Sequence, residues 1–406
     1  MRVALNGFFW DQPLTGSGQY LRHLWTALSE LAQHTPSPGG AAHGLAFSLL
    51  LPPSAQPGAP VPTPPGFSMH KARPLPLGPI SGRSKNMDKL LWEEWGVTRE
   101  AMRHRAQLLH SPYLTAPLPG RGLPSVVTAH DMIPWVVPGY EGSALVRIYL
   151  RLALAGVKRA KLIMADSEAS RKDIIEVLNV PPRKVRTVYL GMEPHPEYAP
   201  GELEEVRARF GLPPAYAFYL GGFDRRKNVP LLLRAWRAVV DRVREAGGGE
   251  APTLAIGGGV PGAGGVFPDV RSEAESLGFA GRDSPVRFMG RVSEEDKPRL
   301  MAAARLFVYP SAYEGFGLDP LEAMSVGCPV VSSSGGSLRE VVGDGGLLVP
   351  PNDGAALTEA IVSTWTGPAL RQALARRGKQ QAARFTWHRT AQQTLSIYEE
   401  VMRTED

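Results

Sequence analysis

Residues 306–332, LFVYPSAYEGFGLDPLEAMSVGCPVVS, place an apolar run, a glycine-containing loop, a helix pattern and a second apolar run in direct succession. The apolar runs Leu306–Tyr309 and Val330–Ser332 have the length and composition of buried strands. Between them, a helix is predicted to begin at Asp319 and to end before Pro329. This order is typical of a parallel sheet in an α/β domain.

The same alternation of strands and helices extends over the whole chain. It begins with a predicted strand at Val3–Asn6 and a helix at Gln19–Leu31, and it restarts with a strand at Ala217–Leu220 and a helix at Pro230–Glu245. Two such series predict two doubly wound α/β domains. The other predicted strands are Ala46–Leu51, Leu108–His110, Ser125–Ala129, Leu162–Ala165, Leu254–Ile256, Val286–Met289 and Leu347–Val349.

The 406 residues exceed what one hydrophobic core usually holds. A polar, proline-containing stretch around residue 195 separates the two series, so we expect domains at 1–195 and 196–385 and a terminal helix within 386–406. The segment Pro52–Gly82 is dense in proline and glycine and predicts an irregular loop.

The composition is that of a globular protein, with 43% hydrophobic and 21% charged residues. The net charge of +6 is spread without a Lys/Arg tract, which fits an anionic substrate, and we find no nucleic-acid-binding motif. The single cysteine, Cys328, favours a reducing compartment. The N-terminus lacks the apolar core of a signal peptide, and charges interrupt the longer apolar runs. We therefore expect a cytoplasmic protein.

The loop Glu314–Gly317 joins a strand to the predicted helix, and its glycines allow backbone N–H groups to approach a ligand. A glycine-containing loop before a helix N-terminus suits a phosphate. Glu314 lies where there is no helix to cap, although a solvated loop carboxylate is the alternative. Glu322 fits a ligand-binding role, and with Asp319 it also fits a capping box.

Arg225, Arg226 and Lys227 lie between a strand and the N-terminus of the next predicted helix. The helix dipole disfavours cations at this position, and an anionic ligand would reverse that effect. The alternative is a solvated basic turn.

His130 follows the predicted strand Ser125–Ala129 and would reach the ligand-binding edge of the sheet, although a structural histidine is the alternative. Gly16 and Gly18, in TGSGQY, would let the first turn approach a sugar or phosphate, or would belong to a plain loop.

Together these segments resemble the family four retaining glycosyltransferases, whose GT-B fold has two Rossmann-like doubly wound domains facing a cleft. The resemblance covers nearly the whole chain. The strongest element is EGFGLDPLE at residues 314–322, followed by GCPVVSSSGGSLREVVGDGGLLVPP. TGSGQY, VTAHDMIP, SEASRKDI, VYLGME and FDRRKN support it.

The resemblance implies that the C-terminal domain binds a nucleotide-diphosphate sugar and the N-terminal domain an acceptor. Glu322 would hold the ribose hydroxyls, and Glu314 would lie near the donor sugar and its phosphates. Arg226 and Lys227 would neutralise the diphosphate. His130 would lie near the reacting carbon. The remaining positions implied are Gly222, Gly315, Phe316, Gly317, Leu318, Arg291 and Val292 for the donor, and Gly16 and Gly18 for the cleft.

One position departs from the pattern: many relatives carry an arginine where this chain has Gly222, and Arg225 or Arg226 would supply that charge. FDRRKN with His-Asp looks like mannosyltransferase members, which favours GDP-mannose, while UDP- and ADP-sugars stay open. The acceptor would be a glycan, a lipid-linked sugar or a small molecule. The resemblance implies retention of configuration.

The chain contains no Asp-x-Asp pair, the usual sign of a metal-bridged diphosphate in the other major glycosyltransferase fold. We therefore expect metal independence and no cofactor, with basic side chains and a helix N-terminus stabilising the leaving diphosphate.

Three other functions fit parts of the sequence. Residues 257–262 match the G-x-G-x-x-G pattern of dehydrogenases, but the residues that follow do not open a helix. A sugar-nucleotide epimerase or a non-catalytic nucleotide-sugar-binding protein would share the fold.

A peripheral membrane contact also fits the sequence, at the inner face of the membrane. Trp92 and Trp95 follow a basic stretch, and basic residues surround an apolar helix pattern. These basic residues are Arg147, Arg151, Lys158, Arg159 and Lys161. A solvated helix face with a buried stripe is the alternative.

Overall fold

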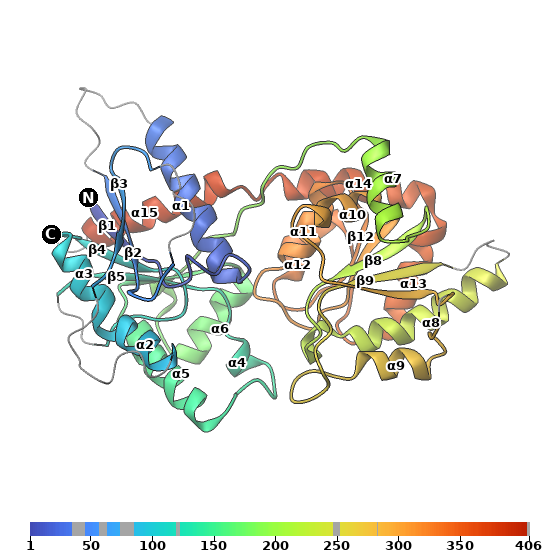
Figure 1. The fold of residues 1–406 in the computed structure, drawn as a ribbon, viewed down its shortest axis with the longest axis horizontal. Helices are drawn as coiled ribbons and strands as arrows, with labels where there is room; N and C mark the ends of the chain where they lie inside the picture. The colour runs from blue at the N-terminus through green and yellow to red at the C-terminus, as the bar shows by residue number, and fades with distance from the viewer. Residues whose placement is uncertain are drawn as a thin grey trace. The chain divides into compact units, whose positions relative to one another are not determined.

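The computed structural model describes residues 1–34, 45–56, 63–73, 85–118, 122–246, 252–281 and 283–403. The chain divides into two compact units, shown in Figure 1. The N-terminal unit comprises Met1–Gly191 and Thr386–Asp406, and the C-terminal unit comprises Met192–Phe385. The border at Gly191 falls slightly before the expected one, inside the proline-containing stretch that suggested it.

The N-terminal unit is built on a parallel sheet of seven strands in the order β3-β2-β1-β4-β5-β6-β7. Most of its residues are buried, as in a sheet covered on both faces. The strands are β1 (Arg2–Asn6), β2 (Ala46–Leu51), β3 (Phe67–Lys71), β4 (Leu108–Ser111), β5 (Ser125–Ala129), β6 (Leu162–Ala165) and β7 (Val185–Thr187).

The helices of this unit connect successive strands, apart from the last, which returns from the far end of the chain. They are α1 (Gly16–His34), α2 (Lys85–Leu91), the π-helical turn η2 (Trp92–Gly96), α3 (Val97–Arg103), α4 (Ile133–Val136), α5 (Ala144–Val157), α6 (Glu168–Leu178), the 3-10 turn η3 (Pro182–Lys184) and α15 (Trp387–Arg403).

The prediction of an irregular loop at Pro52–Gly82 is wrong for part of that segment. Phe67–Lys71 forms β3, which pairs in parallel with β2 at the edge of the sheet. Gly66 enters this strand with φ +88°, a conformation that glycine adopts readily. Tertiary pairing thus overrides the loop-like composition on either side of a short strand. Residues 57–62 and 74–82 of the prediction lie outside the described residues.

The C-terminal unit has a parallel sheet of six strands in the order β10-β9-β8-β11-β12-β13. Two doubly wound α/β units, as predicted, are therefore confirmed. The strands are β8 (Tyr216–Leu220), β9 (Thr253–Gly257), β10 (Val286–Gly290), β11 (Leu306–Tyr309), β12 (Val330–Ser333) and β13 (Leu347–Val349).

The helices of the C-terminal unit pack through apolar stripes, as α8 shows with buried Leu232, Leu233, Trp236, Val239 and Val240. They are α7 (Pro200–Arg209), the 3-10 turn η4 (Arg225–Lys227), α8 (Val229–Glu245), α9 (Val270–Ser276), α10 (Asp296–Ala303), α11 (Leu318–Ser325), α12 (Leu338–Val342), the 3-10 turn η5 (Gly343–Gly345), α13 (Gly354–Thr366) and α14 (Pro368–Ala382).

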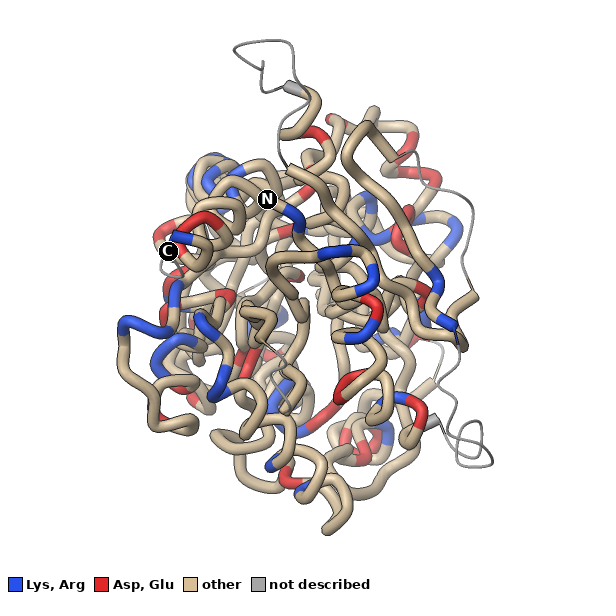
Figure 2. Tube along the Cα trace, turned by 90° about the vertical axis from the view of Figure 1, so that its left-hand side faces the viewer, with Lys and Arg blue, Asp and Glu red and all other residues tan. Residues whose placement is uncertain are grey.

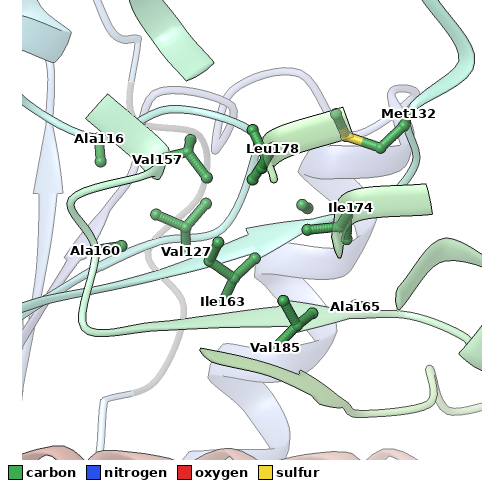
Figure 3. Close-up of a cluster of buried hydrophobic side chains, with 11 residues drawn as sticks. Ala116, Val127, Met132, Val157, Ala160, Ile163, Ala165, Ile174, Leu178 and Val185 are labelled. Atoms are coloured by element: carbon green, nitrogen blue, oxygen red, sulfur yellow. The ribbon is translucent and has the colours of Figure 1, made fainter. Parts of the chain in front are cut away.

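The core beneath the carboxyl ends of β5 and β6 is an apolar cluster, drawn in Figure 3. Side chains from these strands interlock with residues of α5 and α6, so the loop that follows β5 starts from a rigid base. The cluster comprises Ala116, Val127, Ala129, Met132, Val157, Ala160, Ile163, Ala165, Ile174, Leu178 and Val185.

Helix α15 lies within the segment 386–406, where a terminal helix was predicted, and packs on α1. Its buried residues follow helical spacing, and Tyr398 reaches the sheet through a 2.7 Å hydrogen bond to Nδ1 of His110. Arg186 pairs with Glu400 at 2.5 Å. The last helix therefore belongs to the core of the N-terminal unit.

Lys and Arg are interspersed with Asp and Glu along the chain drawn in Figure 2, and the positive charge is spread as the sequence suggested. Among the described residues, no helix is long and apolar enough to cross a membrane.

Candidate functional site

The C-terminal unit gathers charged side chains where its strand order reverses, between β8 and β11. The chain runs from β8 to β9 and β10 on one side and then returns to β11 on the other. Ligands of open α/β sheets bind at such a point, beyond the carboxyl ends of the strands. The two loops that start here carry Lys227 and Glu314.

Glu314 is 7% exposed and accepts hydrogen bonds from several donors. Lys227 Nζ lies 2.8 Å from its Oε1, and Arg226 Nη1 lies 2.7 Å from its Oε2. The Ser311 hydroxyl donates to Oε1 at 2.6 Å. Burial alone would raise the pKa of Glu314, but Lys227 and Arg226 hold that pKa below its ordinary value. Glu314 is therefore an ionised carboxylate that holds two cations in place.

Arg226 and Lys227 belong to the 3-10 turn η4 and are the cations predicted for a diphosphate. Arg226 also pairs with Asp224 at 3.2 Å. Lys227 is 8% exposed and donates to the Tyr309 hydroxyl at 2.5 Å. Arg225, the third cation of the turn, is exposed. The protein's own carboxylates thus already balance the two site cations.

The loop that carries Glu314 ends at Gly317, which adopts φ +105° and precedes α11. Asp319 was predicted to cap this helix, and that prediction is wrong because the left-handed Gly317 starts the helix earlier. Asp319 is instead inside the first turn and contacts the Tyr309 hydroxyl at 3.1 Å. Phe316 is buried, and its ring meets Phe385 edge-on at 5.8 Å.

Glu322 does not cap the helix, so the capping-box alternative is wrong. Its carboxylate is 7% exposed and pairs with Lys297 Nζ at 2.8 Å, while His195 Nε2 lies 3.7 Å from its other oxygen. Burial raises the pKa of Glu322 to about 7, even though Lys297 opposes this shift. Within the described residues, His195 Nε2 is buried without a hydrogen-bond partner.

The other predicted donor positions lie at the same edge of the sheet. Gly222 is exposed after β8, and its carbonyl accepts a 2.5 Å hydrogen bond from Tyr219. Arg291 and Val292 follow β10 and border the glycines at the end of β9, since a Cβ on Gly259 would lie 3.5 Å from Arg291 Nε. The G-x-G-x-x-G segment at 257–262 opens no helix, because α9 begins only at Val270.

Sequence reasoning missed several residues that complete this site. Ser337 donates through its hydroxyl to the Glu314 carbonyl at 3.0 Å and so holds the loop. Tyr309 and Ser311 support the Glu314 carboxylate from the end of β11. The SSSGGS segment hinted at Ser337, but the position of Lys297 in α10 carries no local signal.

In the N-terminal unit, His130 follows β5 and contacts Asp166 from the end of β6. His130 Nδ1 lies 2.7 Å from Asp166 Oδ2, and Nε2 lies 3.1 Å from the Pro112 carbonyl. Both partners are acceptors, so both ring nitrogens carry protons when both bonds form. Burial lowers the pKa of His130, but Asp166 outweighs burial and raises the pKa above its ordinary value. The structure thus favours an imidazolium.

Gly16 and Gly18, in the first turn of α1, differ in the space around them. A Cβ on Gly18 would lie 2.1 Å from the Gln12 carbonyl oxygen, so Gly18 is required by packing against the chain itself. Gly16 is exposed, and a Cβ at that position would meet nothing within 4 Å among the described residues.

Asp131, which follows His130, stabilises its own turn by accepting a hydrogen bond from the Ile133 amide at 3.0 Å.

Two parallel-sheet Rossmann-like α/β units define the GT-B class of folds. Residues 214–366 match the family described as "Glycosyl transferases group 1", and residues 41–195 match "Glycosyltransferase Family 4". The chain belongs to these group 1, family 4 glycosyltransferases.

The relatives differ in acceptor. The chain is 36% identical to the O-antigen chain mannosyltransferase B of Escherichia coli over 69% of this chain and 71% of that protein. It is 34% identical to a D-inositol 3-phosphate glycosyltransferase of Nocardioides over 60% of this chain and 54% of that protein. Sucrose-phosphate synthase from Thermosynechococcus elongatus shares the fold, with a TM-score of 0.72, 21% identity and 100% coverage of both chains.

Proposed function

We propose that the protein transfers a hexose, mannose from GDP-mannose, to the hydroxyl of a glycan, lipid-linked sugar or small molecule with retention of configuration. The observation that carries this proposal is the cluster of Glu314, Lys227 and Arg226 beside the N-terminus of α11. The mannosyltransferase relative supports the choice of donor.

The chemical difficulty of the reaction is the leaving group. Breaking the bond between sugar and phosphate leaves negative charge on a nucleoside diphosphate, and preorganised cations and backbone dipoles lower that barrier. Lys227 and Arg226 are held ready by Glu314, so they need no rearrangement when the charge develops. Glu314 acts here as a positioning residue, because an ionised carboxylate with these partners has no proton to give.

The remaining predicted roles stay proposals. Glu322 would accept hydrogen bonds from the ribose hydroxyls, and the main chain near Arg291 and Val292 would face the base. Gly222 and the loop Gly315–Leu318 would adjoin the diphosphate. His130 would act as a cation toward the donor sugar. We also propose that the reaction needs no metal and no cofactor.

The test is a thermal-shift panel of GDP-mannose, UDP-glucose and ADP-glucose, followed by assays with and without EDTA. We expect GDP-mannose to raise the melting temperature most, because a ligand that binds only the folded state stabilises it. Product NMR should show the donor's anomeric configuration, and EDTA should leave the rate unchanged. A shift with UDP-glucose alone would overturn the choice of donor, and inversion would overturn the mechanism.

Peripheral contact with anionic lipid is a second proposal, supported by the N-terminal half of α5. Leu145 is 79% exposed and Ile148 54%, beside the exposed Arg147 and Arg151. The predicted contribution of Trp92 is wrong, because that side chain is buried and donates to Asn6 at 2.8 Å. Sedimentation with phosphatidylglycerol vesicles should recover the protein and not a variant with Leu145→Ser and Ile148→Ser. Equal recovery of both would contradict this proposal.

A further inference from the structure

The strand order of the N-terminal unit also reverses, and that point carries aromatic residues. The chain leaves β1 toward β2 and β3 on one side, and β4 then lies on the other side of β1. Phe8 and Phe9 follow β1, and Tyr113 follows β4. Open α/β sheets bind ligands at such a reversal of strand order, beyond the carboxyl ends of the strands.

The rings surround the ammonium group of Lys89 on α2. Lys89 Nζ lies 5.6 Å from the ring centroid of Phe8, 5.4 Å from that of Phe9, 5.7 Å from that of Tyr113 and 5.1 Å from that of Tyr149. Phe8, Phe9 and Tyr149 are half-buried, so parts of their surfaces face solvent. We call Phe8, Phe9, Tyr113, Tyr149 and Lys89 the aromatic cage.

A buried carboxylate holds Lys89 in this cage. Glu93 Oε1 lies 3.7 Å from Lys89 Nζ, beyond hydrogen-bond distance, while Tyr149 donates to Glu93 Oε2 at 2.9 Å. Lys89 has no hydrogen bond within the described part of the chain, and Glu93 Oε1 is likewise buried without one. Glu93 belongs to the π-helical turn η2, a rare conformation that often marks functional sites. The Lys89 donors are thus available to a ligand.

Hydrogen bonds and ring contacts hold the aromatic cage in place. Trp92 Nε1 donates to Asn6 Oδ1 at 2.8 Å, and Asn6 Nδ2 donates to the Tyr113 hydroxyl at 3.0 Å. Phe9 meets Tyr113 edge-on at 4.8 Å. These contacts tie the loops after β1 and β4 to η2, so the rings are preorganised.

We propose that the aromatic cage is the subsite for an uncharged pyranose ring of the acceptor. The C–H face of a pyranose carries slight positive charge and suits the negative face of an aromatic ring. The Lys89 ammonium would donate to the hydroxyls at the rim of the sugar. This inference rests on the proposed function and narrows its acceptor to a neutral sugar.

A phosphorylated acceptor fits this subsite less well. Aromatic faces attract cations and repel anions, and Glu93 adds a carboxylate beneath the only cation of the cage. The cage thus favours the acceptor chemistry of a glycan over that of an inositol phosphate.

The test compares methyl α-mannoside with mannose 6-phosphate, two probes with the same ring and different charge. Saturation-transfer NMR should show binding of the methyl mannoside to the wild-type protein and weaker binding of the phosphate. Phe9→Ala and Lys89→Met should each raise the KM for methyl α-mannoside as acceptor by about tenfold, with a smaller effect on kcat. Lys89→Arg should restore part of the acceptor affinity that Lys89→Met loses.

Met102→Ala is the matched control, because Met102 is 51% exposed on α3, which leads to the opposite end of β4. The thermal shift caused by GDP-mannose should persist in Phe9→Ala, which shows an intact donor site. An unchanged acceptor KM in both cage variants, or tighter binding of mannose 6-phosphate, would overturn the inference. If GDP-mannose does not raise the melting temperature of the wild-type protein, the proposed function is contradicted instead.

Discussion

In the C-terminal unit the strand order reverses between β8 and β11, and the loops there carry Glu314, Arg226 and Lys227. In the N-terminal unit it reverses between β1 and β4, and the loops there carry Phe8, Phe9 and Tyr113. One sheet plan thus presents cations and carboxylates in one unit and aromatic rings in the other. The fold sets where a ligand binds, and the loops set its chemistry.

Glu314 of the C-terminal unit and Glu93 of the N-terminal unit are buried glutamates beside a lysine, and their pKa values shift in opposite directions. Lys227 and Arg226 both donate to Glu314 and outweigh burial, so the pKa of Glu314 is lowered. Burial dominates at Glu93, whose lysine partner lies 3.7 Å away, so the pKa of Glu93 is raised. Two close cations outweigh burial at Glu314, whereas a single lysine does not outweigh it at Glu93 or at Glu322.

The strongest test of this comparison removes a cation from the charged loops. Lys227→Ala should lower kcat by about 10³-fold, because the developing diphosphate charge loses a preorganised partner. It should also lower the melting temperature, since Glu314 loses a buried partner. Arg234→Ala, which removes an exposed cation of α8, should remain close to wild type in kcat. Similar kcat values for Lys227→Ala and the wild type would refute the assignment.

Two glycines in the first turn of α1, Gly16 and Gly18, offer a second test. Gly18→Ala should destabilise the protein by about 2 kcal/mol, because its Cβ would meet the Gln12 carbonyl. Gly16→Ala should leave stability nearly unchanged, since the space around it is open. Chemical denaturation of both variants measures the difference. Equal stabilities would show that packing does not require a glycine at position 18 in the first turn of α1.

The His130–Asp166 pair predicts a change in pH dependence. In Asp166→Asn the pKa of His130 should fall, so turnover should drop on the order of tenfold as the pH rises from about 6 to about 8. The turnover of the wild type should decline only at higher pH, because the raised pKa of His130 keeps its ring protonated. While Asp166 is ionised, the contribution of His130 to stability should be present below the unfolded-state pKa of histidine and lost as the pH rises through the raised folded-state pKa of His130. Coincident pH profiles of kcat would rule out a cationic role for His130.

The smallest expected effect concerns Glu322. With a pKa of about 7, Glu322 gains a proton as the pH falls below neutrality, and GDP-mannose affinity should weaken several-fold because a carboxylate accepts ribose hydroxyl bonds more strongly than an acid does. Titrations of the donor at several pH values would measure this. Glu322→Gln should abolish the dependence, and a pH-dependent affinity retained in that variant would assign it to another group.

Much of the fold was predictable because buried parallel strands are short apolar runs with clear ends. Ala46–Leu51, Ser125–Ala129 and Leu162–Ala165 have the predicted bounds. The strand β3 escaped prediction because only its pairing with β2 stabilises it. The helix start near Asp319 was misplaced because the left-handed Gly317 leaves little signal in the sequence.

The sequence by itself determined the alternation of elements, the family, and which loops carry Glu314, Arg226, Lys227 and His130. Only the tertiary structure decided which distant side chains come together: Lys297 with Glu322, Asp166 with His130, and the aromatic rings with Lys89. The physical reason is the separation along the chain of the residues that interact. Strand and helix patterns arise from neighbouring residues, whereas a buried charge takes its state from groups that sheet pairing brings near from distant parts of the chain.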